Sequence, residues 1–342
     1  MGCSVVVGGF FGDEGKGKII AYIVNKDNTS LAARGGVGPN AGHTFVVGDK
    51  TFKVRMLPSA ALNTKTKLAV GAGVLVNPEV LIQEITSFNA HKRTFIDGNC
   101  GIISKEHIRK DLSTNHLKNN IGTTGTGTGP ANSDRALRIL TLAKDQAELK
   151  DYISDVSSMI HFHLDKKEDV LIEGTQGTFL SLFHGGYPFV TSKDVTASSI
   201  CADVGIGPKN VDDVLVVFKS YVTRVGAGPL ENELDRDESV KRGWLEFGSV
   251  TGRERRSSPF NIEMAKRAIR LNGATSLAIT KMDVLYPQTA GITEYTKLPI
   301  NSRNFIENIE SELGLKVVLI GTGADVNAVI DRRNRTTKLF NN

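Results

Sequence analysis

Short runs of apolar, mostly β-branched residues recur along the chain, and several of them end in glycine. Their positions are apolar consecutively, which is typical of strands that are buried on both faces of a sheet, usually a parallel one. The runs occupy residues 4–9, 67–76, 169–174, 213–222, 276–285 and 316–323. The pattern therefore predicts the strands of one central sheet.

Helical periodicity separates some of these runs. Residues 78–88 and 261–273 repeat apolar side chains at the spacing of one helix face, and the second segment ends on a glycine that is typical of a helix C-terminus. His161 and His163 alternate along a segment that we interpret as a possible strand, and we interpret both as structural. Together the segments predict an α/β fold with an open, mostly parallel central sheet flanked by helices. Ligands of such sheets bind beyond the carboxyl ends of the strands, where the glycine-rich turns lie.

The turn after the first predicted strand, GGFFGDEGKGKII (residues 8–20), has the features of a phosphate-binding loop. Its glycines allow backbone N–H groups to approach a phosphate, and the following helix offers its N-terminus to the anion. A standard loop of this type continues with a serine or threonine that binds Mg²⁺, but Ile19 occupies that place. Because Mg²⁺ prefers carboxylate oxygens, we expect Asp13 or Glu14 to supply the ligand. The alternative is a flexible turn with two solvated lysines.

The segment ITKMDVL (279–285) ends a predicted strand and contains the pattern T-K-x-D. The Asp283 carboxylate can accept hydrogen bonds from guanine N1–H and the 2-amino group, whereas adenine would leave it unpaired. The stem of Lys281 can lie across the base, and the glycine-rich end of residues 316–325 can flank it. The alternative is a solvated ion pair at an exposed strand end. Combined with a phosphate loop, the pattern predicts a guanine nucleotide.

Polar side chains in three further segments are candidates for contacts with other substrates. His43 lies among small residues, where it can act as a general acid, although a structural histidine is the alternative. Arg253, Arg255 and Arg256 can bind a carboxylate or phosphate through paired bonds, or form a solvated run of charge. Gln176 follows a predicted strand and can read an amide-like edge of a base.

Composition narrows the class of protein. A chain of 342 residues can bury a large core in one or two domains. The net charge of +5 is spread along the chain, so it does not indicate a nucleic-acid partner. The three cysteines form no C-x-x-C pair, which argues against a disulfide framework or a zinc site. Without a signal peptide or a membrane-spanning apolar run, we expect a cytoplasmic protein with no membrane partner.

A series of motifs makes the sequence similar to the adenylosuccinate synthetase family over nearly the whole chain. In chain order they are GDEGKGK (12–18), NAGHT (40–44), GTTGTGTGPA (122–131), EGTQGT (173–178), YPFVTS (187–192), TRVGAGP (223–229), TGRERR (251–256), TKMD (280–283) and GTG (321–323). The resemblance implies a single domain over residues 1–342, related to the P-loop nucleotide-binding folds. It also implies the short archaeal-type form, since the segments near 140–168 and 287–315 are reduced.

The resemblance implies a ligase that joins IMP to L-aspartate and hydrolyses GTP to GDP and phosphate, on the route from IMP to AMP in purine biosynthesis. Asp13 is implied as the base that removes the N1 proton of IMP, so that O6 attacks the γ-phosphate and forms 6-phosphoryl-IMP. His43 is implied as the acid that stabilises the departing GDP. One Mg²⁺ per subunit is implied, bound by Asp13 and the backbone carbonyl of Gly42.

By the same resemblance, each substrate has a set of expected contacts. GTP would contact Gly12, Asp13, Glu14, Gly15, Lys16, Gly17, Lys18, Gly42, His43, Thr44, Arg255, Lys281, Met282, Asp283, Gly321, Thr322 and Gly323. IMP would contact Asp13, Glu14, Gly15, Lys16, Asn40, Ala41, Gly42, His43, Thr124, Arg138, Gln176, Thr191, Val225 and Arg253. Aspartate would contact Ser249, Val250, Thr251, Gly252, Arg253, Glu254 and Arg255. Arg138 would reach the site of a partner subunit, which implies a homodimer.

Some positions depart from the family's usual pattern. Val250 replaces a threonine, Gly321 a serine and Thr126 an arginine, and two extra residues precede Asn40. Two other functions remain open on the residues alone. A GTPase or GTP-dependent regulator would turn over GTP without IMP or aspartate, and a nucleotide-binding structural protein would show no turnover.

Overall fold

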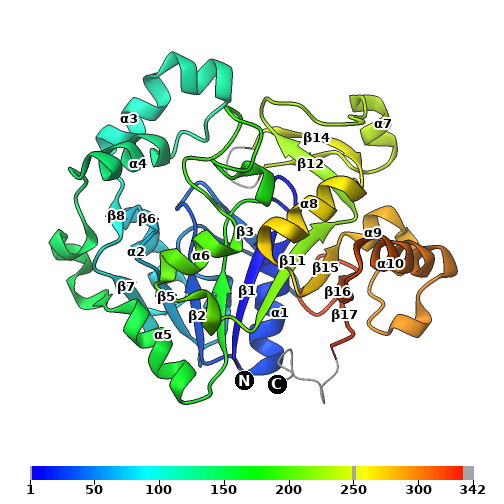
Figure 1. The fold of residues 1–342 in the computed structure, drawn as a ribbon, viewed down its shortest axis with the longest axis horizontal. Helices are drawn as coiled ribbons and strands as arrows, with labels where there is room; N and C mark the ends of the chain where they lie inside the picture. Colours follow the sequence, from blue (N-terminus) through cyan, green and yellow to red (C-terminus); the bar gives the residue numbers. More distant parts are fainter. Residues whose placement is uncertain (1, 249–251, 334–342) are drawn as a thin grey trace.

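A computed structural model describes residues 2–248 and 252–333 of the chain (Figure 1). Ten strands form the central sheet, in the order β17-β16-β15-β11-β1-β10-β2-β5-β7-β9. They are β1 (Cys3–Gly8), β2 (Leu31–Arg34), β5 (Lys67–Val70), β7 (Thr94–Asp97), β9 (Ile153–Ser154), β10 (Val170–Glu173), β11 (Asp213–Lys219), β15 (Ser276–Thr280), β16 (Val317–Gly321) and β17 (Val329–Asp331). Only the edge pair β16–β17 is antiparallel. The predicted open, mostly parallel sheet is therefore confirmed.

Helices cover both faces of this sheet, so its strands are buried on both sides. Successive residues of β1 show this, because Val5 and Val7 join one core cluster whereas Val6 joins the other. The first cluster includes residues of α5 (Val156–Asp165), α6 (Ala197–Val204), α8 (Ile262–Asn272) and α10 (Ile300–Leu313). The second includes residues of α1 (Lys16–Asp27) and α2 (Pro78–Ser87). Burial on both faces explains why the strands read as continuous apolar runs.

Three of the apolar runs are longer than the strands that they contain. Residues 67–76 divide into β5 and β6 (Leu75–Val76) at a turn in which the Val74 amide donates to the Gly71 carbonyl oxygen at 3.0 Å. Gly73 lies in this turn, and a Cβ there would stand 1.9 Å from Asp203 Oδ1. Residues 213–222 divide into β11 and the start of β12 (Tyr221–Val225). Residues 276–285 divide into β15 and the short helix α9 (Met282–Leu285) at Lys281, whose φ of 62° ends the strand. Apolar composition alone does not reveal such turns.

The two predicted helices are confirmed as α2 and α8, and Gly273 ends α8 with a φ of 61°. The interpretation of His161 and His163 as strand residues is wrong, because both lie in α5. Asp155 caps that helix by accepting a hydrogen bond of 2.8 Å from the amide of Ser158. An alternation of only two histidines is a weaker signal of local structure than a helix cap of this kind.

Additional elements stand beyond the carboxyl ends of the central strands, at the end of the molecule opposite the N-terminus (Figure 1). On one side are α3 (Lys105–Ser113) and α4 (Thr128–Leu137), and on the other are α7 (Arg236–Lys241) and the small antiparallel sheet β12-β14-β13. The remaining strands are β3 (His43–Val47), β4 (Lys50–Val54), β8 (Gly101–Ile102), β13 (Glu246–Phe247) and β14 (Glu254–Pro259). No helix within residues 2–248 and 252–333 is long and apolar enough to cross a membrane.

Candidate active site

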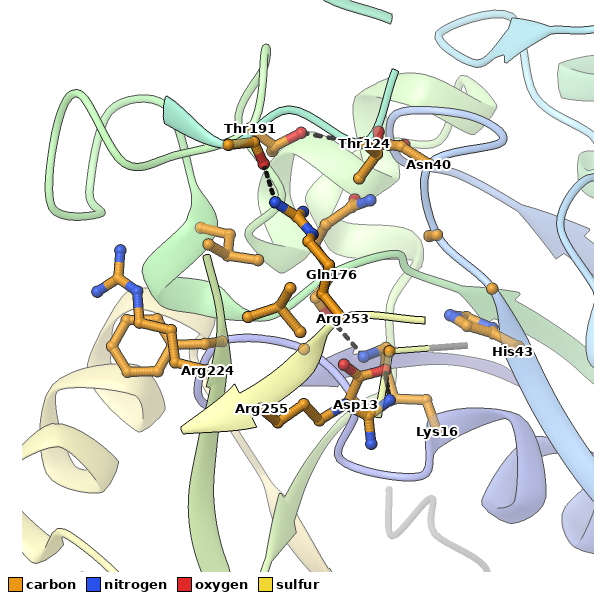
Figure 2. A pocket seen from close by; sticks show the side chains of 18 of the residues that line it. Asp13, Lys16, Asn40, His43, Thr124, Gln176, Thr191, Arg224, Arg253 and Arg255 are labelled. Atoms are coloured by element: carbon orange, nitrogen blue, oxygen red, sulfur yellow. Dashed lines mark hydrogen bonds and ion pairs between the residues drawn. The ribbon is translucent and has the colours of Figure 1, made fainter. Parts of the chain in front are cut away.

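A cavity of about 800 Å³ opens at the carboxyl ends of the central strands, between these additional elements. Figure 2 shows Asn40, Thr124 and Thr191 on one side of it and Asp13 and Arg255 on the other. Most of the predicted contact residues line this cavity. They are Gly12, Asp13, Gly15, Lys16, Gly17, Lys18, Asn40, Ala41, Gly42, His43, Thr44, Thr124, Gln176, Thr191, Val225, Arg253, Arg255, Lys281 and Gly323. Segments from across the sequence thus meet where the sheet was expected to bind ligands.

Other predicted contact residues do not line the cavity. Those that the structure describes are Glu14, Arg138, Gly252, Glu254, Met282, Asp283, Gly321 and Thr322. Ser249, Val250 and Thr251, which belong to the expected aspartate loop, lie outside the described residues.

The two acids of the first loop have different surroundings. The carboxylate of Glu14 is buried and accepts hydrogen bonds from the amides of Phe10 (3.0 Å) and Gly12 (2.8 Å) and from Lys16 Nζ (2.8 Å). Glu14 therefore holds the loop together from within. Asp13 instead lines the cavity, where its Oδ1 lies 2.8 Å from Arg255 Nη2. Of the two acids that the sequence left open as a metal ligand, Asp13 is the one that faces the cavity.

Backbone conformation singles out several of the same positions. Asp13, Gln176 and Lys281 line the cavity, and each has a positive φ, as has Arg138 outside it. This left-handed region costs a side-chain-bearing residue roughly 1–3 kcal/mol, and such strain concentrates at functional sites. The strain therefore supports a functional reason for the direction in which these side chains point.

Several buried polar atoms in and beside the cavity have no hydrogen-bond partner among the described residues. They include Asn40 Oδ1, Gln176 Nε2, Arg255 Nε and Asp283 Oδ1. The opposite end of the Asn40 amide is held in place, since its Nδ2 donates to Thr191 Oγ1 at 3.2 Å. Buried polar groups in folded proteins normally have a partner. We infer that these atoms face ligand groups.

His43 contacts a buried carboxylate behind the cavity wall. Its Nδ1 touches Glu173 Oε1, which also lies 3.1 Å from Arg34 Nη1. Burial and the nearby Arg34 charge lower the pKa of His43 to about 4. The sequence did not identify Arg34, and no role was predicted for Glu173. The position of Glu173 at the end of a strand, before a glycine-rich turn, was nevertheless a usable signal.

Lys18 does not extend freely toward a phosphate. Its Nζ donates to the carbonyl oxygens of Gly323 (2.5 Å) and Ala328 (2.7 Å), and burial lowers its pKa to about 8. Lys18 therefore ties the first loop to the turn that was expected to flank the guanine base. Lys16 is also engaged, since it bonds the carbonyl oxygen of Gln176 in addition to Glu14.

Glu246 was also missed, and its carboxylate contacts side chains from four other segments. It accepts hydrogen bonds from Lys219 Nζ (2.9 Å), Arg255 Nη1 (2.5 Å) and the Tyr221 hydroxyl, and Lys281 Nζ lies 3.7 Å away. Burial opposes its ionisation, but the charges of Lys219, Lys281 and Arg255 outweigh that effect and lower its pKa. Glu246 thereby connects the arginine beside Asp13 with the lysine of the guanine motif.

The chain is similar to proteins of a known family over almost its whole length. The family model for adenylosuccinate synthetase matches residues 5–146 and 138–289. The adenylosuccinate synthetase of Methanocaldococcus jannaschii is 53% identical over 335 residues, which cover 97% of each chain. That of Pyrococcus horikoshii is 50% identical over 333 residues, covering 96% of this chain and 98% of the relative.

A solved structure agrees with this result. The fully ligated adenylosuccinate synthetase of Plasmodium falciparum superimposes with a TM-score of 0.89 at 26% identity, covering 96% of this chain and 99% of that chain. The similarity to the family was thus correctly read from the motifs. The chain belongs to the adenylosuccinate synthetase family.

Proposed function

We propose that this protein ligates IMP and L-aspartate to form adenylosuccinate, with GTP converted to GDP and phosphate. The observation that carries the proposal is one cavity at the strand ends that is lined by Asp13, His43, Gln176 and Arg255. A simple GTPase can use a glutamine and an arginine, but it would have no use for the separate polar set of Asn40, Thr124 and Thr191 on the opposite side of this space. Membership of the family supports the same reaction.

The reaction begins with Asp13 as the base for IMP. Asp13 takes the N1 proton, and O6 attacks the γ-phosphorus of GTP while the bond to the β,γ-bridging oxygen breaks. This makes 6-phosphoryl-IMP, which carries a better leaving group than the original oxygen. The amine of aspartate then attacks C6, and phosphate departs from it. A carboxylate within reach of N1 is what the first step needs, and the cavity-facing position of Asp13 supports that role.

The remaining polar groups serve to bind and orient. We propose that Asn40, Thr124, Gln176 and Thr191 hold IMP, because they converge on one side of the cavity (Figure 2). On the other side, His43 and Lys16 stabilise the charge that develops on the departing GDP. The guanidinium groups of Arg253 and Arg255 hold the carboxylates of aspartate, for which paired bonds are the favoured geometry.

Mg²⁺ fits the donors that the cavity offers. The described residues contain no cluster of three or more histidine, cysteine or acidic side chains able to hold a metal ion. A metal bound mainly by phosphates and a few protein oxygens needs no such cluster, and Mg²⁺ is typically bound in this way. We propose that Asp13 and the carbonyl of Gly42 hold it. When bound, Mg²⁺ supplies positive charge against the phosphate oxygens.

A substrate-omission assay tests the proposed reaction. We expect GDP and adenylosuccinate to form in equal amounts only when IMP, aspartate, GTP and Mg²⁺ are all present. GDP is expected to fall to background when IMP and aspartate are left out, because the γ-phosphate then has no acceptor. The measurement is a chromatographic count of both products. GDP production at the same rate without IMP and aspartate would identify a GTPase instead.

We further propose a homodimer in which Arg138 serves the partner's site. Arg138 ends α4 and is exposed, with no place in the lining of its own cavity. Beside it Leu137 and Ile139 are 64% and 68% exposed, and Leu112 on the neighbouring helix α3 is 53% exposed. Exposed apolar side chains on both sides of an arginine in the chain, and on the helix that packs against it, are typical of a surface that is covered by a partner.

Mixing two inactive variants tests this arrangement. Arg138→Leu damages the site that the arginine enters, and Asp13→Asn damages the site of its own subunit. A mixed dimer then contains one intact site, so random exchange of subunits is expected to restore about a quarter of the wild-type activity. The measurement is adenylosuccinate formation before and after mixing, with each variant alone as the control. No recovery in a mixture shown to contain mixed dimers would place Arg138 in its own subunit's site or outside both.

We propose a single domain over residues 1–342, since the central sheet joins strands from β1, at the start of the described residues, to β17, near their end. We propose a cytoplasmic location, which the three buried free thiols of Cys3, Cys100 and Cys201 support.

A further inference from the structure

A cluster of buried, hydrogen-bonded polar side chains lies directly behind His43 and has no part in the reaction described above. Glu173 is at its centre, with a fully buried side chain. Its Oε1 contacts His43 Nδ1 and accepts hydrogen bonds from Arg34 Nη1 (3.1 Å) and Ser59 Oγ (2.8 Å). Its Oε2 accepts from the amide of Ser59 at 2.6 Å. Both carboxylate oxygens are therefore fixed, and Glu173 has no freedom to turn away from the histidine.

The backbone determines this arrangement. Arg34 and Glu173 are the last residues of β2 and β10, and they are Cα partners across the two parallel strands. Arg34 is itself fully buried, and its Nη2 donates to the carbonyl oxygen of Ala41 at 3.0 Å, just before His43 in the chain. The same arginine thus holds the carboxylate and the loop that carries the histidine.

Glu173 is held as a carboxylate rather than a carboxylic acid. Burial by itself would raise the pKa of Glu173, but the contact with His43, the charge of Arg34 and the hydrogen bond from the Ser59 amide lower it overall. An ionised carboxylate can only accept hydrogen bonds, so the proton in its contact with His43 lies on the ring. The ring nitrogen that remains for other partners is Nε2, and His43 lines the cavity.

We propose that Glu173 is the positioning residue of His43: it fixes the ring through Nδ1–H and leaves Nε2 as the atom that faces GTP, where Nε2 can donate to the departing GDP once it is protonated. This inference rests on the proposed function, because the role of His43 toward GTP belongs to that proposal. A carboxylate behind a catalytic histidine selects its tautomer and orientation and balances the positive charge of its fully protonated form. Arg34 and Ser59 in turn position Glu173.

Glu173→Gln tests the role of the charge. We expect kcat for adenylosuccinate formation to fall by about 100-fold or more, whereas the KM values for IMP, GTP and aspartate change by less than about threefold. The matched control is Glu84→Gln. Glu84 is also a buried carboxylate and accepts three backbone amides at Arg55, Met56 and Leu57, but it has no contact with His43. The control is expected to keep its kcat at temperatures where both variants are folded.

The tautomer provides a readout that does not depend on activity. In the ¹⁵N spectrum of the ligand-free wild-type chain at neutral pH, the His43 signals, identified by their loss in His43→Asn, are expected to place the proton on Nδ1. If Glu173→Gln does not fold, Ser59→Ala removes one bond to Oε1, and we expect kcat to fall about threefold to tenfold with unchanged KM values.

Several outcomes would overturn the positioning role. They are a proton on Nε2 alone in the wild-type spectrum, an unchanged kcat in folded Glu173→Gln, or an equal loss of kcat in Glu84→Gln. Failure of the proposed function has a different signature, since the wild-type chain would then form no adenylosuccinate although the spectrum still reported the Nδ1 proton.

Discussion

Asp13→Asn is expected to abolish adenylosuccinate formation while the fold and the binding of IMP remain. An amide cannot take up the N1 proton of IMP, and a positioned general base contributes about 10²–10⁴-fold to a rate. We therefore expect kcat to fall by at least that factor. In the wild-type chain Arg255 Nη2 lies 2.8 Å from Asp13 Oδ1, and the oxygen of an asparagine can still accept a hydrogen bond from this arginine. The loop therefore has no reason to rearrange. The measurement is a single-turnover assay of 6-phosphoryl transfer together with IMP binding by calorimetry.

Asp27→Asn provides a matched control at the opposite end of α1. Asp27 forms an ion pair with Arg333 and is the last residue of α1, at the end of the helix away from the cavity. This change is therefore expected to leave kcat unaltered. Both variants should unfold near the wild-type temperature. Near-normal turnover in folded Asp13→Asn would refute the assignment of the base and would require another group to take the proton.

Asp283→Asn is expected to remove the preference for guanine. The carboxylate can accept from both N1–H and the 2-amino group, whereas an asparagine side chain offers one acceptor and one donor. Asp283 Oδ1 is buried without a partner among the described residues, so it is available for those bonds. Sites built to pair with a particular hydrogen-bonding edge discriminate by 10⁴-fold or more. We expect kcat/KM for GTP to fall by about 10²–10⁴-fold and to approach that for ITP, which lacks the 2-amino group.

The check is the ratio of kcat/KM values for GTP, ITP and ATP. Asp325→Asn is the matched control. Asp325 lies close to the turn 321–323 that was expected to flank the guanine base, but its carboxylate accepts hydrogen bonds from the amides of Gly48 and Asn327. That variant should keep the wild-type ratio. An unchanged ratio of GTP to ITP in Asp283→Asn would show that this carboxylate does not read the base.

The sequence predicted those parts of the fold and the site whose signals are local. A continuous apolar run followed by glycines identified β1 and the first loop, and a periodic segment with a terminal glycine identified α8. Both signals arise within about a dozen residues. The elements that they predict form because no contact with a distant segment overrides the local preference. The prediction of a single strand over residues 67–76 was wrong for the opposite reason, because the distant residue Asp203 lies close to Gly73, between the two strands that form there.

The parts of the site that sequence could not reveal depend on contacts between distant segments. Whether Asp13 or Glu14 faces the cavity depends on a positive φ of 61° at Asp13, which the letters G-D-E-G leave undetermined. The partners of Glu246 come from β11, β12, β14 and the turn after β15, so no short motif contains them. Only the folded chain shows which charges balance one another.

The bonds of Lys18 have a consequence for how the protein is made. Lys18 stands at the start of the chain, but its carbonyl partners follow 305 and 310 residues later. The loop that leaves the ribosome first therefore reaches its final shape only when the last strands of the sheet are in place, and contacts of such separation form late and slowly. A fragment that stops before residue 315 would contain every letter of the glycine-rich motif and still lack both carbonyl groups that hold Lys18.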